Sequence, residues 1–431
     1  MTVLHAASGH ATDQAEPLTV DGAYERSRRA ALTESHVGPV GLEIESHLVD
    51  LDSISEPVPW DRVGAMLKVL GCAGAHSKVS LEPGGQLELS SPPAPTIESV
   101  LALLRHDMSR TRLALAELRL GLAHSGADPL RSPLRVNPRP RYEAMEQHFA
   151  ATGRAAAGAV MMNSTAAMQV NLQAGPRREW PQRVARAYRL GPTLVAISAS
   201  SPWLRGRDTG WKSARQRAWA GLDPRSCGPV PGCVAAAAAA DHALDPASAW
   251  ARYAMAAPVV FVGSGTDSAN AVRVPVPFER WASGAVRLDG RLPTAADLDL
   301  HLTTLFPPVR LRGYLELRYL DMTAPRWWPA IAAIVATLMD DPVAADRMTE
   351  ATEGTAPLWT VAAREGLRNP MLAESARRCV RIAAERVPAG LRSAVADLAE
   401  LVDSGWCPGD LLARRIAEVG PLAAFEELAH A

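Results

Sequence analysis

The sequence has few cysteines, few lysines and no excess of either charge. Its 431 residues include five cysteines and no Cys-x-x-Cys pair, so neither a disulfide framework nor a cysteine-rich metal site is indicated, and we expect a reducing, cytoplasmic location. The net charge is -1, which leaves no sequence-wide field that would recruit nucleic acid or an acidic membrane. Only three of the 45 basic residues are lysine. Together with the many alanines, this is typical of a GC-rich genome.

Long apolar runs and the common nucleotide- and metal-binding motifs are also absent from the sequence. The longest apolar stretch, residues 329–339, is about half the ~20 residues that a membrane-spanning helix needs. The sequence contains no G-x-x-x-x-G-K-[ST] loop, no strand-linked G-x-G-x-x-G, no H-E-x-x-H and no G-x-S-x-G. Any bound nucleotide is therefore held through oxygen-coordinated metal ions and arginines, and not through a glycine-rich loop.

The sequence does contain four short segments in which carboxylates or amides alternate with aliphatic residues. They are residues 41–46, 80–90, 168–173 and 312–319. Side chains in a strand alternate between faces, so each segment would place its polar groups on one face. If the four strands share a sheet, one face is apolar and packs against helices. The other face gathers four or five carboxylates, which repel one another unless cations hold them, and this face is our candidate active site.

Each acidic pattern also has an ordinary structural interpretation. Glu43 and Glu45 alone match any half-solvated strand, which shows the same alternation. Glu82 precedes the tight turn of residues 83–85, Pro-Gly-Gly, where glycine permits the close approach of a ligand. Glu82 and Glu88 would then flank the turn. They would lie either at a ligand site or as exposed acids of a hairpin.

Two further pairs combine an arginine with a neighbour. Glu316 and Arg318, on one strand face, would hold a metal ion and grip a phosphate, or would form a salt bridge within the sheet worth about 0–1 kcal/mol if exposed. Arg215 and Trp219 are four residues apart and would share a helix face. They would clamp a substrate carboxylate, or pack as a core tryptophan beside a snorkelling arginine. The residues alone leave both choices open.

The chain is predicted to consist of a flexible N-terminus, residues 1–20, and a single domain, residues 21–431. Helices are predicted at residues 21–32 and 99–120, the second capped by Thr96. Residues 325–431 have mostly helical periodicity. We therefore predict an α+β fold in which helices cover the apolar face of the sheet.

Taken together, the segments resemble conserved blocks of the glutamate-cysteine ligase family, in its plant and proteobacterial branch. The similarity extends over about residues 38–325, and the composition resembles that of actinobacterial members. The matching blocks are residues 43–45, 80–90, 169–172, 301–306 and 312–318. The resemblance implies a curled antiparallel sheet like that of glutamine synthetase, forming a funnel with ATP and magnesium at one end and amino acids at the other.

Carried over position by position, the resemblance implies a role for each polar residue. The implied magnesium ligands, for about two or three ions, are Glu43, Glu45, Glu82, Glu88 and Glu316. Gln169 would lie beside the metals at the nucleotide. Arg318 would contact the transferred phosphate and, with Glu316, carry the catalysis. Arg215 would bind the α-carboxylate of glutamate, with Trp219 as a wall of that pocket.

The implied activity is the ATP-dependent joining of the γ-carboxylate of L-glutamate to the amine of L-cysteine through a γ-glutamyl phosphate. The product, γ-glutamylcysteine, would supply ergothioneine biosynthesis, and the enzyme is expected to be a monomer. Two alternatives remain. One is a ligase of the same fold that uses another amine acceptor, and the other is a non-catalytic protein whose acidic face binds divalent metal.

Overall fold

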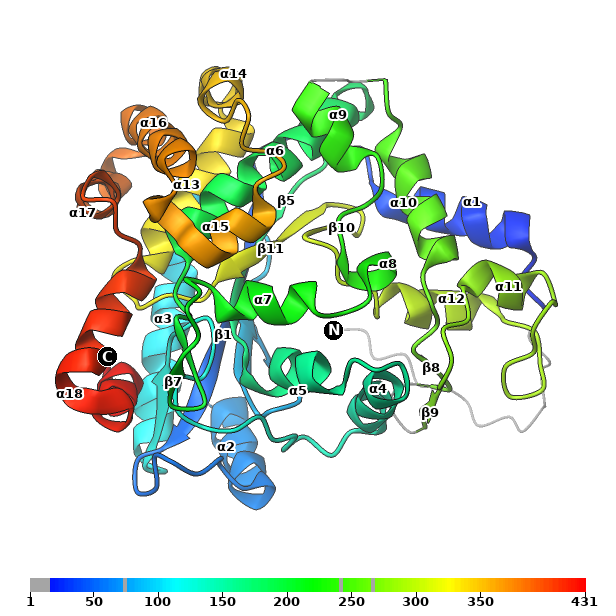
Figure 1. Ribbon diagram of the computed structural model, residues 1–431, viewed down its shortest axis with the longest axis horizontal. Helices are drawn as coiled ribbons and strands as arrows, with labels where there is room; N and C mark the ends of the chain where they lie inside the picture. Colours follow the sequence, from blue (N-terminus) through cyan, green and yellow to red (C-terminus); the bar gives the residue numbers. More distant parts are fainter. Residues whose placement is uncertain (1–15, 73–75, 240–242, 265–267) are drawn as a thin grey trace.

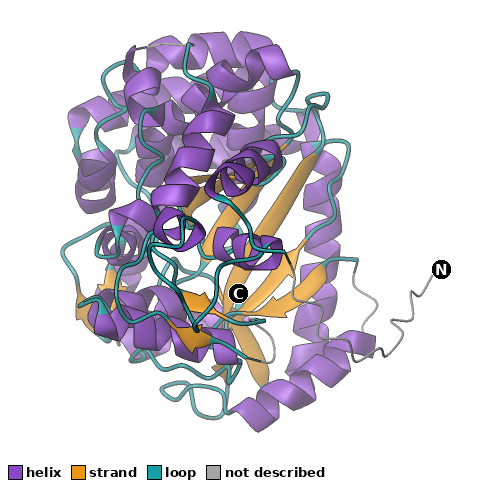
Figure 2. Ribbon diagram, turned by 90° about the vertical axis from the view of Figure 1, so that its right-hand side faces the viewer, coloured by secondary structure: helices purple, strands orange, loops and turns teal. Residues whose placement is uncertain are grey.

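The computed structural model describes residues 16–72, 76–239, 243–264 and 268–431. Most of the N-terminal segment predicted to be flexible, residues 1–15, therefore lies outside the described residues. The remainder is an α+β structure built around one large antiparallel sheet (Figures 1 and 2). This agrees with the fold class predicted from the four alternating segments.

The described residues form a seven-stranded sheet in which every pairing is antiparallel. The strand order is β10-β11-β5-β1-β3-β2, and β4 pairs with the second half of the long strand β1. The four predicted strand segments all lie in this sheet. The strands are β1 (Val40–Asp50), β2 (Lys78–Leu81), β3 (Leu87–Ser90), β4 (Leu120–Ala123), β5 (Ala167–Leu172), β10 (Val309–Leu311) and β11 (Leu315–Asp321). The short pairs β6 (Trp203–Leu204) with β7 (Arg207–Asp208) and β8 (Phe261–Val262) with β9 (Asn270–Ala271) lie apart from it.

Helices surround the sheet (Figure 2). In the first half of the chain they are α1 (Val20–Ala31), α2 (Trp60–Cys72), α3 (Ile97–Ala116), α4 (Pro140–Ala151), α5 (Ala155–Ser164), α6 (Trp180–Ser198) and α7 (Ala214–Ala220). The middle contributes α8 (Pro224–Cys227), α9 (Cys233–Ala239), α10 (Pro246–Ala256), α11 (Phe278–Ala282) and α12 (Ala295–Leu302). The remainder are α13 (Trp328–Asp340), α14 (Pro342–Ala351), α15 (Trp359–Glu365), α16 (Pro370–Arg386), α17 (Arg392–Asp403) and α18 (Pro408–His430). Three-residue 3₁₀ turns occupy Arg177–Glu179, Gly366–Arg368 and Ala389–Leu391.

One face of the sheet is apolar and packs against α3, α6 and α13. The alternation places Leu42 and Ile44 of β1, Val170 of β5 and Leu317 of β11 on this face, where none has any solvent exposure. These residues share one hydrophobic core with the apolar sides of α6, α13 and α16. The C-terminal helices therefore close the back of the sheet and leave the opposite, polar face toward α4, α5 and α7 (Figure 1).

The predicted helix at residues 99–120 is shorter in the structure. Its start is as expected, because Thr96 caps the helix and its hydroxyl accepts a hydrogen bond from the Ser99 amide. The helix ends at Ala116, however, and Leu120 belongs to β4, which pairs with Asp50 of β1. Pairing with β1 gives the backbone of this segment its hydrogen-bond partners and overrides its local helical pattern.

Among the residues whose side chains are described there is no single membrane-length helix and no disulfide. Within the described residues, no single helix is long and apolar enough to cross a bilayer; only α13 and α14 taken together have the length and composition, and they bend by 99° at their junction. Cys227, Cys233, Cys379 and Cys407 are free thiols. No disulfide therefore links the cysteines whose side chains are described.

Candidate active site

The polar face of the sheet brings three acidic strand positions together. Glu45 of β1 lies opposite Glu88 of β3 in the strand register, and Glu43 lies opposite Gln169 of β5 on its other side. Because these positions share one face, their side chains meet on the side away from the apolar core. The period-two prediction for this face is therefore confirmed.

The turn between β2 and β3 adds a fourth carboxylate. The Gln86 carbonyl accepts a hydrogen bond from the Glu82 amide, and Gly85 adopts φ 84°, a conformation that favours glycine. At Gly84 the hairpin meets α5 so closely that a Cβ there would lie 2.3 Å from the Asn163 carbonyl oxygen. This contact fixes the turn against α5 and holds Glu82 at the cavity.

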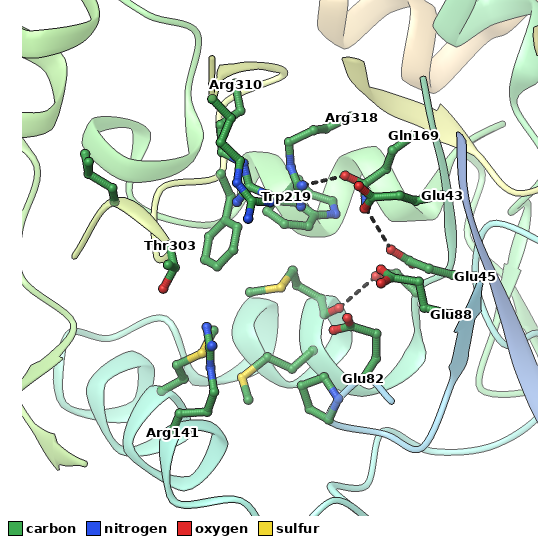
Figure 3. A pocket seen from close by; sticks show the side chains of 18 of the residues that line it. Glu43, Glu45, Glu82, Glu88, Arg141, Gln169, Trp219, Thr303, Arg310 and Arg318 are labelled. Carbon is green, nitrogen blue, oxygen red and sulfur yellow. Dashed lines mark hydrogen bonds between the residues drawn. The ribbon is translucent and has the colours of Figure 1, made fainter. Parts of the chain in front are cut away.

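Hydrogen bonds hold these side chains in a defined arrangement (Figure 3). Arg318 donates from Nη1 to Gln169 Oε1 at 2.6 Å, and Gln169 Nε2 donates to Glu45 Oε1 at 3.2 Å. The other oxygen of Glu45 accepts the Ala167 amide at 2.7 Å. Gln169 thus links Arg318 to Glu45, and both of its amide atoms have assigned partners.

The remaining two strand carboxylates are each held at one oxygen. Asn171 donates to Glu43 Oε1 at 2.9 Å. Ser80 and Ser90 both donate to Glu88 Oε1, at 2.6 and 2.9 Å. Each carboxylate is oriented by these donors, and the second oxygen of each carries no hydrogen bond from the described residues, so it is available to a ligand.

The four carboxylates line a cavity of about 580 Å³, which is large enough for a nucleotide and an amino acid. Figure 3 shows the acids on one side of it, with Arg318 and Arg310 above them and Arg141 across the gap. The lining contains eight of the nine residues predicted for the site: Glu43, Glu45, Glu82, Glu88, Gln169, Arg215, Trp219 and Arg318.

Burial in the cavity makes Glu43, Glu45 and Glu82 hard to ionise. Burial, with repulsion from Glu88, raises the pKa of Glu45 to about 7 and that of Glu82 to about 8. Burial also raises the pKa of Glu43, assisted by repulsion from Glu316 and Glu88. Attraction to Arg215 and Arg318 lowers the pKa of Glu45, but it offsets only part of the rise that burial causes. A bound cation would remove the rest, so the donor set fits a hard divalent metal.

The described residues of the cavity do not form a complete set of metal ligands by themselves. Within the parts of the chain that the structure describes, no three His, Cys, Asp or Glu side chains are grouped closely enough to hold an ion by themselves. Magnesium usually keeps several waters and shares its coordination with substrate phosphates. Spread carboxylates around a nucleotide-sized cavity suit that mode of binding.

Arg215 and Trp219 lie on α7 and line the cavity. The Arg215 guanidinium carbon lies 5.8 Å from the centre of the Trp219 ring, which stacks edge-on against Phe306 at 5.7 Å. Arg215 is only 2% exposed, and its Nη2 donates to the Arg318 carbonyl at 2.7 Å. Its Nε and Nη1 have no hydrogen-bond partner among the described residues. Nε and Nη1 lie on different edges of the guanidinium, and each is a buried donor that can bind one oxygen of a ligand carboxylate.

Glu316 is the ninth predicted residue, and the structure places it behind the cavity wall. Its side chain has no exposure and forms a bidentate ion pair with Arg310, and Arg318 Nη1 lies 3.2 Å from its Oε2. Burial alone would raise its pKa, but Arg310 and Arg318 outweigh burial and lower the pKa to about 2. Glu316 therefore anchors two cavity arginines in this structure. A metal ion would have to displace one of them to reach it.

The cavity residues that were missing from the sequence prediction include two buried or half-buried arginines, Arg310 and Arg141. Arg310 of β10 lies opposite Glu316 in the register, so that knowledge of β10 was needed to find it. Arg141, at the start of α4, lines the wall opposite the acids, and its Nε has no hydrogen-bond partner among the described residues. Its only signal in the sequence is its place in a loop rich in proline and arginine.

The raised pKa values predict how the metal-free protein responds to pH. In the pH range where Glu45 and Glu82 are protonated in the folded protein but ionised in the unfolded chain, unfolding releases protons. The free energy of unfolding therefore falls as the pH rises. This loss continues through about pH 7 to 8. Buried histidines with lowered pKa values act in the opposite sense only up to about pH 6.5; they are His47, His124, His148 and His301.

We therefore expect the melting temperature of the metal-free protein to fall between about pH 7 and 8.5, and magnesium to raise it more at the higher pH. Thermal unfolding followed by circular dichroism, with and without the ion, measures both effects. Glu45→Gln, which cannot ionise, should reduce the pH dependence. A melting temperature that rises over this range without metal would contradict the assigned origin of the pKa shifts.

Comparison with known proteins identifies the family to which this chain belongs. Residues 39–427 match the model of glutamate-cysteine ligase family 2. A crystal structure of glutamate-cysteine ligase from Francisella tularensis in complex with AMP has a similar fold, with a TM-score of 0.56 over 92% of this chain and 88% of that one, at 12% identity. The chain belongs to glutamate-cysteine ligase family 2.

Individual relatives extend over nearly the whole chain. Glutamate-cysteine ligase EgtA of Mycobacterium tuberculosis H37Rv is 46% identical over 422 residues, covering 97% of this chain and 96% of its own. EgtA of Mycolicibacterium smegmatis is 47% identical over 401 residues, 93% and 92% of the two chains. The chloroplastic enzyme of Arabidopsis thaliana is 30% identical over 323 residues, 74% of this chain and 59% of its own.

Proposed function

We propose that this protein is an ATP-dependent glutamate-cysteine ligase that joins the γ-carboxylate of L-glutamate to the amine of L-cysteine. One observation carries the proposal beyond family membership. Four carboxylates, Arg318 and Arg215 line a single nucleotide-sized cavity, and two donors of Arg215 have no partner among the described residues. Such a site offers charge neutralisation and positioning, the two contributions that phosphoryl transfer requires.

The chemistry needs an activated acid. A carboxylate does not react with an amine at neutral pH, because oxide would be the leaving group. Transfer of the γ-phosphoryl group of ATP to the side-chain carboxylate of glutamate forms a C–O–P anhydride and releases ADP. The cysteine amine then attacks the carbonyl carbon, the C–O bond to phosphate breaks, and an amide, phosphate and a proton result.

The acidic residues are the proposed metal ligands. Glu43, Glu45, Glu82 and Glu88 would hold about two or three Mg²⁺ ions together with phosphate oxygens and water, and Gln169 would lie beside them at the nucleotide. When bound, the ions neutralise the charge that develops on the transferred phosphoryl group. Glu316 is the fifth proposed ligand. Its ion pair with Arg310 gives it a second candidate role, in which it anchors the cavity arginines.

The arginines are proposed to hold the substrates. Arg318 lies between Gln169 and Glu316 and faces Phe306, whose ring centre is 5.7 Å from the guanidinium carbon. It would contact the phosphoryl group in transfer. Arg215 would bind the α-carboxylate of glutamate, and Trp219 would form the adjoining wall. We also propose that the antiparallel sheet curls around the site as in glutamine synthetase, with residues 21–431 acting as one catalytic domain and the enzyme as a monomer.

Replacement of Arg215 by lysine tests the glutamate site. Lysine keeps the charge but not the fixed, planar arrangement of the guanidinium donors, so the KM for glutamate should rise roughly tenfold to a hundredfold. The KM for ATP should stay nearly unchanged. Steady-state kinetics with each substrate varied in turn measures both. Equal increases in the two KM values would contradict a specific contact with glutamate.

The proposed reaction is tested by incubating the purified protein with ATP, magnesium, glutamate and cysteine. We expect γ-glutamylcysteine by mass spectrometry and one ADP for each dipeptide formed. A panel of other amines, supplied one at a time, tests for a same-fold ligase with another acceptor. ADP release with a different amine and none with cysteine would replace the proposal. Metal binding without ADP release under any mixture would identify a non-catalytic metal-binding protein.

The resemblance to actinobacterial members extends the proposal to the fate of the product. Two of the relatives above are mycobacterial EgtA proteins at 46% and 47% identity. We propose that the γ-glutamylcysteine made here supplies ergothioneine biosynthesis. Deletion of the gene should remove ergothioneine from cell extracts, and an unchanged ergothioneine content would contradict this assignment.

A further inference from the structure

A buried carboxylate that the reaction does not use lies behind α7. Asp321 is the last residue of β11, three positions beyond Arg318, and it is 1% exposed. Its Oδ2 accepts the Ser200 amide at 3.0 Å and the Ser201 hydroxyl at 2.6 Å. Its Oδ1 accepts the Ser213 hydroxyl at 2.8 Å. One side chain therefore ties β11 to two separate segments of the chain.

Ser201 and Ser213 connect Asp321 to the first turn of α7 through further hydrogen bonds. Ser213 is the N-cap of the helix, and its hydroxyl oxygen accepts the Gln216 amide at 3.1 Å. The hydroxyl oxygen of Ser201 accepts the Arg215 amide at 3.2 Å. Each hydroxyl donates its hydrogen to Asp321 and accepts from the first turn of α7. The carboxylate thereby sets the orientation of both serines and of the backbone that carries Arg215.

Asp321 also balances the charge of Arg215 without using its free donors. Oδ1 lies 3.8 Å from Arg215 Nη1, close enough for strong attraction but beyond hydrogen-bond distance. The guanidinium is buried, and an uncompensated charge there would be costly. As a result, Nε and Nη1 remain without partners among the described residues while their charge is offset.

The position of the carboxylate is itself enforced. A Cβ built on Gly126 would lie 2.4 Å from Asp321 Oδ2. The backbone of Gly126 is held in turn, because its amide donates to the Ser200 carbonyl and its carbonyl accepts the Ala166 amide. Glycine is thus required for the close approach of this segment to the carboxylate.

We propose that Asp321 is a positioning residue for glutamate: it holds Arg215 charge-balanced and oriented, so that its Nε and Nη1 stay free and either of them can donate to the α-carboxylate. This inference rests on the proposed function, because it takes Arg215 as the glutamate contact. It assigns a task to a residue that touches no substrate. It also explains why a buried arginine can keep unpaired donors.

The test is Asp321→Asn, which preserves shape and removes charge. We expect the KM for glutamate to rise about tenfold, equivalent to about 1.4 kcal/mol of binding. The KM for ATP and the kcat at saturating glutamate should change less than about threefold. An unchanged KM for glutamate in the folded variant would overturn the inference, as would parallel changes in both KM values.

A matched control separates positioning from loss of structure. Asp340 is also a largely buried aspartate paired with a buried arginine, with its Oδ1 2.7 Å from Arg183 Nη2, and it lies outside the cavity. Asp340→Asn should lower the melting temperature and leave the KM for glutamate unchanged. An equal rise in the KM for glutamate in Asp340→Asn would overturn the inference.

A milder variant covers the case in which Asp321→Asn does not fold. Ser201→Ala removes one of the three donors and the acceptor of the Arg215 amide, and it should raise the KM for glutamate by a smaller factor. If Ser201→Ala is folded and its KM is that of the wild type, the inference fails. A wild-type protein that makes no γ-glutamyl product would instead count against the proposed function itself.

Discussion

Replacing Arg318 with lysine is expected to lower kcat by at least about a hundredfold, with the fold retained. An arginine placed on a transferred phosphoryl group contributes about 10³ to 10⁵ in rate, and the point charge of lysine cannot reproduce its planar fork. The Arg318 guanidinium is held in place through Nη1, which donates to Gln169 Oε1 at 2.6 Å and lies 3.2 Å from Glu316 Oε2. Single-turnover measurement of ADP formation reports the loss directly.

The control for this variant is another arginine stacked on an aromatic ring. The Arg326 guanidinium carbon lies 4.7 Å from the centre of the Trp327 ring, on a side chain that is 64% exposed and outside the cavity. Arg326→Lys should retain full activity. Wild-type turnover by Arg318→Lys would exclude a phosphate contact at this position.

The second large effect is expected for Glu316→Gln, which should leave only a small residual ligation activity and also destabilise the protein. Removing the partner of a buried ion pair typically costs about 3–5 kcal/mol. Glu316 has no exposure and neutralises Arg310 while attracting Arg318. Chemical denaturation measures the stability change, and the coupled release of ADP measures activity.

The two roles considered for Glu316 predict different responses to magnesium. If Glu316 is a ligand, Glu316→Gln should shift the magnesium dependence of residual activity to higher concentration. If it only anchors the arginines, the magnesium dependence should be unchanged and the activity low throughout. Asp340→Asn is the matched control for loss of a buried charge alone. Full turnover and full stability of Glu316→Gln would contradict both roles.

The main sheet could be predicted because its strands carry a period-two signal on a half-buried surface. Residues 41–46 and 168–173 pair directly as β1 and β5, and the polar face forms where the parity of Glu43 and Gln169 required. The strand β4 could not be found this way. Its four residues, Leu-Gly-Leu-Ala, are all buried and show no alternation, so only the pairing with β1 identifies them as a strand.

The site was predicted where a residue belongs to a motif and missed where tertiary contact alone defines it. The acids of β1, of β3 and of the turn reach the cavity as parity and the resemblance implied. Parity also put Glu316 on the polar face, but it could not show that Arg310 of the unpredicted strand β10 would cover its carboxylate. Asp321 follows a register shift in β11, which breaks the simple count from Arg318.

The central claim is that the cavity transfers a phosphoryl group to the side-chain carboxylate of glutamate. The most direct measurement uses glutamate labelled with ¹⁸O in its γ-carboxylate, followed by mass analysis of the phosphate released during ligation. The account predicts one labelled oxygen in each phosphate, because the C–O bond of the γ-glutamyl phosphate breaks. Unlabelled phosphate accompanying dipeptide formation would contradict it.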